Sequence, residues 1–175
     1  MRVSLLDIDS NCSTGVLFGY GDLNPSSALA HYGLAMAFVL TGRLEQVITE
    51  SDTAIRLSPR DPLVWAFYAY RAWARVLLGD YEAAVEDARR AILHPAATFW
   101  PHAALASALA LLDRPEEAKI ALDKLLEVKP DFTPDTVLVA YSPLNPEALR
   151  ARFKTWIDGL RKAGLDIPDE PVAND

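Results

Sequence analysis

Residues 72–85 read Ala-Trp-Ala-Arg-Val-Leu-Leu-Gly-Asp-Tyr-Glu-Ala-Ala-Val, and this stretch decides the fold. Apolar residues recur at helical spacing on both sides of Gly79, so the stretch predicts a helix, a bend and a second helix. Glycine adopts positive φ at low cost, and a chain that leaves one helix to start another commonly needs that conformation.

Two other blocks of the sequence align with this one. Aligned on the small residue inside the first helix, the blocks are separated by 37 and then 34 residues. The same two separations hold in all four columns, which are Ala35, Ala72 and Ala106; Gly42, Gly79 and Asp113; Val47, Ala84 and Ala118; and Ala54, Ala91 and Leu125. Agreement of both separations in four columns argues against a chance alignment.

The three blocks resemble the tetratricopeptide (TPR) repeat family, whose unit is a pair of antiparallel helices about 34 residues long. The resemblance covers residues 26–131. It implies an all-α fold, a right-handed superhelical stack of three TPR-like helix-turn-helix pairs closed by a C-terminal capping helix. Asp113 stands at the bend where the other two blocks have glycine. It departs from the family pattern, because positive φ costs more for a residue with a side chain than for glycine.

Proline and capping residues mark the expected helix boundaries. Asp61-Pro62, Thr133-Pro134 and Asn145-Pro146 each place a capping side chain just before a proline at the first helical position. The second block has three extra residues, so its first helix is expected to be longer than its neighbours. We expect helices near residues 26–41, 44–57, 62–78, 82–93, 99–112, 116–127, 134–141 and 146–162.

The chain divides into four predicted parts. Residues 1–25 form an irregular N-terminal segment or a degenerate repeat, and residues 26–131 form the three repeats. Residues 132–164 form C-terminal capping helices, since stacked repeats leave an apolar end to cover, and residues 165–175 form a mobile acidic tail.

Composition excludes several classes of protein. The 175 residues are 51% hydrophobic and carry a formal net charge of −7, which disfavours nucleic acid as a partner. The longest apolar stretches fall short of the roughly 20 residues that a membrane span needs. The single cysteine, Cys12, cannot form an intramolecular disulfide, and the N-terminus lacks the apolar centre of a signal peptide, so we expect a cytoplasmic protein.

In a TPR stack the first helix of each pair lines the concave surface, so the contact residues are expected there. Large apolar and aromatic side chains favour protein contacts. Helical spacing selects as the partner-binding set Tyr32, Met36, Tyr70, Trp73, Leu77, Trp100 and Ser107, with Leu29, Val39 and Ala103 on the same faces. Alternatively, these aromatic residues fill the narrow curve of a short stack or pack against residues 1–25.

Charged side chains in this region are expected to be structural. Arg71 and Arg75 are one turn apart in a very apolar helix, and a buried guanidinium needs a paired acceptor. Glu82 or Glu86 is the expected acceptor, and an anionic partner group is the alternative. Because the concave face is aromatic and aliphatic, we do not expect the carboxylate clamp of TPR domains that hold chaperone tails.

Nothing in the sequence favours an enzyme. His31, His94 and His102 lie on different helices or helix ends without metal-ligand spacing, so no metal and no cofactor is expected. The pattern Gly19-Tyr-Gly-Asp lacks the glycines and the strand-helix unit of a dinucleotide site.

A looser resemblance is to the C-terminal repeat region of certain bacterial adenylate cyclases and winged-helix regulators. The sequence segments that show this resemblance are RLSPRDPL (56–63), LLGDYEAA (77–84) and GLRKAGL (159–165). It implies a sensory or assembly role, although neither a cyclase nor a DNA-binding domain fits within these residues.

The sequence therefore predicts a protein-interaction module that binds a peptide or a partner helix through an aromatic concave face. Two alternatives stay open, a self-assembling homodimeric unit and a regulatory domain that senses a small apolar ligand.

Overall fold

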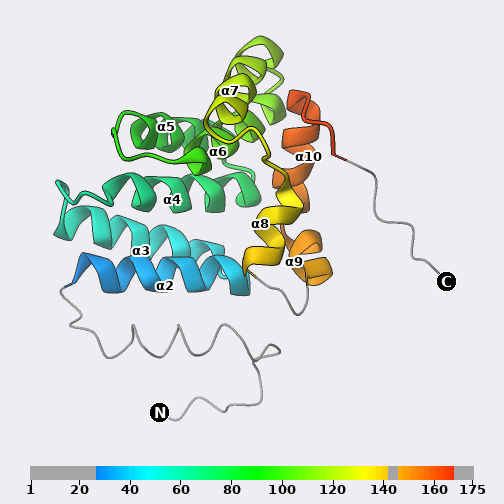
Figure 1. Ribbon diagram of the computed structural model, residues 1–175. Helices are drawn as coiled ribbons and strands as arrows, with labels where there is room; N and C mark the ends of the chain where they lie inside the picture. The colour runs from blue at the N-terminus through cyan, green and yellow to red at the C-terminus, as the bar shows by residue number, and fades with distance from the viewer. Residues whose placement is uncertain (1–26, 142–145, 168–175) are drawn as a thin grey trace.

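The computed structural model describes residues 27–141 and 146–167 (Figure 1). Within those ranges the chain forms helices and no β-strand. With the labels of Figure 1, the helices are α2 (Ala28–Thr41), α3 (Leu44–Leu57), α4 (Val64–Leu78), α5 (Tyr81–Ile92), α6 (Phe99–Leu111), α7 (Pro115–Val128), α8 (Pro134–Tyr141), α9 (Pro146–Arg152) and α10 (Lys154–Ala163). Cys12, Asn145, the interpretation of residues 1–25 and most of the predicted acidic tail lie outside the described residues.

Consecutive helices pack as pairs, α2 with α3, α4 with α5 and α6 with α7, and each pair packs on the next. The six repeat helices agree with the predicted ones to within two residues at each end. The first helices of the pairs also contact one another, α2 with α4 and α4 with α6. We call the surface that α2, α4 and α6 form the first-helix face. The all-α repeat stack is thus confirmed.

Three of the four aligned columns are buried where helices approach one another, and the bend column is exposed. Ala35, Ala72 and Ala106 are at most 1% exposed. The two columns of the second helices are fully buried as well: Val47, Ala84 and Ala118, and Ala54, Ala91 and Leu125. Small side chains at these positions let the helices of neighbouring pairs come close.

The bends inside the pairs have the predicted backbone conformation. Gly42 and Gly79 have φ of 75° and 85°, and Asp113 has φ of 57°. Asp113 is the only non-glycine residue with positive φ among the described residues. Its carboxylate accepts a hydrogen bond from Lys162 Nζ of α10 at 2.5 Å, so the exception lies where a C-terminal helix contacts the bend.

The start of the second pair differs from the prediction. The helix was expected from residue 62, but α4 begins at Val64, because Asp61 Oδ1 accepts a hydrogen bond from the Leu63 backbone N–H at 2.9 Å and shapes a turn instead. Most of the extra length of this block therefore lies in the preceding loop, and α4 has 15 residues against 14 in α2 and 13 in α6. At α8 the cap is confirmed, since Thr133 Oγ1 accepts the Thr136 N–H at 3.2 Å.

The prediction of a single final helix over residues 146–162 is wrong, because the chain bends at Phe153 and forms two helices. Phe153 leaves helical geometry with φ −96° and ψ 14°. Its side chain is fully buried, with the ring centroid 4.6 Å from that of Trp73. Burial of this ring against α4 accompanies the break, and local propensity alone does not show it.

The second of these helices lies on the repeats. α10 packs chiefly on α6 and also contacts α4 and α7 (Figure 1). Leu165 and Ile167, which were assigned to the mobile tail, are buried as well. Part of the first-helix face is therefore covered by the C-terminal end of the same chain.

Candidate functional site: an aromatic pocket on the first-helix face

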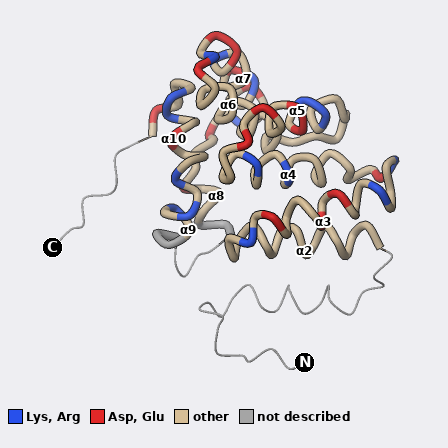
Figure 2. Tube along the Cα trace, turned by 180° about the vertical axis from the view of Figure 1, so that it is seen from behind, with Lys and Arg blue, Asp and Glu red and all other residues tan. Residues whose placement is uncertain are grey.

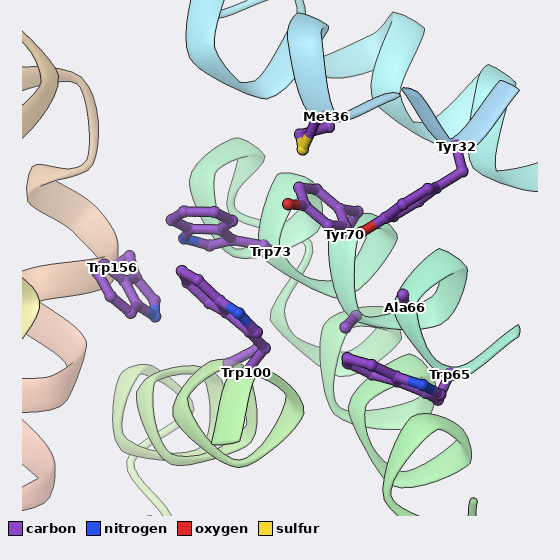
Figure 3. Close-up of a pocket in the computed structure, with 10 residues that line it drawn as sticks. Tyr32, Met36, Trp65, Ala66, Tyr70, Trp73, Trp100 and Trp156 are labelled. Carbon is purple, nitrogen blue, oxygen red and sulfur yellow. The ribbon is translucent and has the colours of Figure 1, made fainter. Parts of the chain in front are cut away.

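The structure brings five of the seven predicted contact residues together around one pocket. Tyr32 and Met36 come from α2, Tyr70 and Trp73 from α4, and Trp100 from α6 (Figure 3). Helical spacing explains part of this convergence, because Tyr32 and Met36 lie four positions apart, and Tyr70 and Trp73 three, so each pair shares one side of its helix. Leu77 is partly buried and does not line the pocket, and neither does Ser107, which is fully buried.

Five further residues complete the pocket, and sequence reasoning missed them. They are Trp65, Ala66, Ala69, Ala104 and Trp156. The three alanines follow from the helical spacing of α4 and α6, since they lie three or four positions from predicted residues. Trp156 comes from α10, outside the repeats, so no repeat column points to it.

All four tryptophans of the sequence line this pocket. The Trp73 ring centroid is 5.1 Å from that of Trp100 and 5.3 Å from that of Trp156. Tyr32 meets Tyr70 edge-on, with centroids 5.5 Å apart and an interplanar angle of 77°. These separations suit favourable aromatic pairs, so the walls hold one another in place. The pocket is partly open and has a volume of about 120 Å³.

The residues that line the pocket are all uncharged. α2 and α6 contain no Asp, Glu, Lys or Arg, whereas α3, α5 and α7 carry charged residues along their length (Figure 2). A surface of this kind offers apolar contact rather than ion pairing.

The two arginines of α4 bind carboxylates of the second helices. The prediction of Glu82 or Glu86 as the acceptor is wrong, since Asp87 of α5 forms an ion pair with both arginines. Arg71 donates from Nε to Asp87 Oδ2 at 2.8 Å and from Nη2 to Oδ1 at 2.5 Å, and it also binds Asp52 of α3. Arg75 Nη1 lies 2.8 Å from Asp87 Oδ2.

The two partners set the pKa of Arg71. Burial acts to lower this pKa, but hydrogen bonds and charges from Asp87 and Asp52 outweigh it and leave the pKa raised. Arg71 therefore stays charged and ties α4 to both neighbouring second helices. The structural interpretation of these arginines fits this geometry.

The described residues hold no group of three or more His, Cys, Asp or Glu side chains able to bind a metal. His31 lies beside Glu50, with Nδ1 and Oε2 2.5 Å apart. In addition, no described helix has the length and apolar character that crossing a bilayer demands.

We expect acidification to destabilise the protein through His102 of α6. Burial first, and then the charge of Lys124, lowers the pKa of His102 below its ordinary 6.5, against a weaker opposing effect of Glu127. As the pH falls through about 6.5, His102 becomes protonated in the unfolded chain, whereas in the folded chain it remains neutral to a lower pH. The free energy of unfolding should therefore drop between pH 7.5 and pH 5.5.

Urea denaturation at the two pH values tests this, with His102→Gln as the comparison. The wild-type chain should lose more stability on acidification than the variant. Equal losses in the two proteins would show that His102 does not contribute.

Residues 102–132 match the sequence profile of the tetratricopeptide repeat. The match covers most of α6, all of α7 and the turn that follows. The third helix pair therefore matches a tetratricopeptide repeat, and the three packed pairs form a helical stack that is consistent with repeats of this kind. Tetratricopeptide repeats generally mediate binding to protein partners and are generally non-catalytic. A search of curated proteins found no match to the sequence.

Proposed function

We propose that this protein is a non-catalytic interaction module that binds a partner peptide by taking one large apolar or aromatic side chain into the aromatic pocket. The observation that carries the proposal is the convergence of all four tryptophans on a partly open pocket between α2, α4, α6 and α10. Tryptophan and tyrosine dominate the binding energy of protein interfaces when they form such a pocket.

The size of the pocket favours a side chain over a free ligand. Sites for small molecules usually enclose about 300–1,000 Å³, whereas this pocket has about 120 Å³. A cavity of roughly 150 Å³ holds a benzene ring, so one ring or one branched aliphatic group matches the space. The small-ligand sensor is therefore the weaker of the alternatives.

The uncharged lining of the pocket fits the same function. Arg71 and Arg75 are engaged with Asp87, and α2 and α6 offer no charged group to a ligand. Affinity should then come from apolar burial and from backbone hydrogen bonds of the peptide, with little dependence on salt.

We predict that peptides selected from a displayed random library on the immobilised chain share one aromatic or large aliphatic anchor. Trp65→Ala should weaken their binding about tenfold or more, because it removes one wall of the pocket. Binding is measured through the intrinsic tryptophan fluorescence, to which every indole of the pocket contributes.

Tyr68→Ala is the matched control, since Tyr68 is a partly buried aromatic residue of the same helix that does not line the pocket. The control should keep affinity within about threefold. Peptides without an apolar anchor, or equal binding to Trp65→Ala, would contradict the proposal. Light scattering over a dilution series distinguishes a homodimer that uses this face for itself.

A further inference from the structure

The pocket lies beside a stretch of the first-helix face that already holds a helix. α10 runs against α6 and reaches α4, and its residue Trp156 forms one wall of the pocket (Figures 1 and 3). Ser107 Oγ of α6 donates a hydrogen bond to the Trp156 backbone oxygen at 3.0 Å, in a fully buried position. α10 therefore indicates what kind of segment the first-helix face can bind.

The closest approach of the two helices is between Ser107 and Gly159. A Cβ atom added to Gly159 would lie 2.1 Å from Ser107 Oγ and 2.8 Å from the Ser107 backbone oxygen. The second atom belongs to the backbone of α6 and cannot turn aside. Glycine is thus required at this position of the docked helix, and any side chain there pushes α10 away from α6.

α10 is strongly amphipathic about this contact. Trp156, Ile157 and Leu160 are at most 3% exposed, and they form the apolar side that rests on the repeats. On the other side Asp158 pairs with Lys154 at 2.5 Å and with Arg161 at 3.1 Å. The docked segment is therefore defined by an apolar side, a charged side and the spacing Trp-x-x-Gly.

We use the name Ser107 strip for the part of α6 around Ser107 that contacts Trp156 and Gly159 of α10. Resting on the proposed function, we propose that the Ser107 strip is a second docking site, for an amphipathic helix with an aromatic residue three positions before a glycine. In this conformation α10 occupies the site from within the chain. A partner helix of the same pattern takes its place and brings its own aromatic residue to the wall of the pocket.

The test uses a fluorescently labelled peptide of residues 146–167 as the probe and the 175-residue chain as the receptor. The wild-type chain should bind the probe weakly, because its own α10 competes at an effective concentration in the millimolar range. Full-length Gly159→Val should bind the probe at least about tenfold more tightly, because its own α10 no longer fits on Ser107.

Two matched controls isolate the contact. A probe that itself carries Gly159→Val should bind the Gly159→Val chain at least about tenfold more weakly than the natural probe does. A chain with Arg161→Val, on the exposed side of the same helix, should behave like wild type. Binding of both probes alike, or no gain for the Gly159→Val chain, would overturn the proposal.

A measurement on the wild-type chain covers the case in which Gly159→Val does not fold. Hydrogen exchange should show that the amides of α10 open more readily than those of α4 and α6, as a helix that leaves separately requires. Equal protection of the three helices would overturn the proposal. Selection of anchored peptides by the pocket does not depend on either result, so failure here leaves the proposed function standing.

Discussion

Asp87→Asn should lower the free energy of unfolding by about 3–5 kcal/mol, because it leaves two buried or partly buried guanidinium groups without their shared carboxylate. Asp87 is 0% exposed and binds both Arg71 and Arg75. Asparagine has nearly the same shape, so the change creates no cavity and isolates the loss of charge and of acceptor capacity. Urea denaturation followed by far-UV circular dichroism measures the loss.

Asp52→Asn provides the control on the same arginine. Asp52 also binds Arg71, but its side chain is 49% exposed, so water replaces the lost interaction. Its removal should cost at most about 1 kcal/mol. A cost for Asp87→Asn as small as that for Asp52→Asn would show that the cluster does not hold α4, α5 and α3 together.

Asp87 also shows where sequence reasoning stops short of the structure. The charges on Arg71 and Arg75 correctly indicated a buried acceptor, but three acidic residues of the next helix were available. Asp87 lies three positions after Ala84 and four before Ala91, which the repeat already placed on the buried side of α5. Helical spacing from those two columns would have preferred Asp87 to Glu82 or Glu86.

The repeats themselves were predictable because their constraint is local. A small residue at a fixed place in each block and a residue with positive φ at each bend define the pairs, and copies of one unit stack alike. Helical spacing within each first helix then selected Tyr32, Met36, Tyr70, Trp73 and Trp100, which the structure brings together at one pocket.

The C-terminal part was less predictable because no second copy exists to align with it. The apolar spacing of residues 149–160 correctly indicated helix, but we expected that helix to cap the open end of the stack, and α10 packs chiefly on α6. It did not indicate the bend at Phe153 or the helix on which α10 rests, because both depend on the space left between α4 and α6. For the same reason, Trp156 was not predicted as a wall of the pocket.

Trp156→Ala is the second change for which we expect a large effect. It should weaken the docking of α10 on the repeats by about 3–5 kcal/mol of free energy. The indole is 1% exposed and contacts Trp73, and its ring centroid is 6.3 Å from that of Phe132. Truncation removes this packing and leaves a cavity between rigid aromatic neighbours that cannot close it. The fluorescence of the three remaining tryptophans during urea denaturation measures the release of α10.

Trp65→Ala is the appropriate comparison, because Trp65 lines the same pocket but is only partly buried. Its stability cost should be about 1–2 kcal/mol. A difference in favour of Trp156 would mean that a residue outside the repeats stabilises the first-helix face more than a tryptophan within them. Equal costs would mean that Trp156 contributes no more than a half-buried pocket residue, and the docking of α10 on the Ser107 strip would then depend on Ile157, Leu160 and the Gly159 contact.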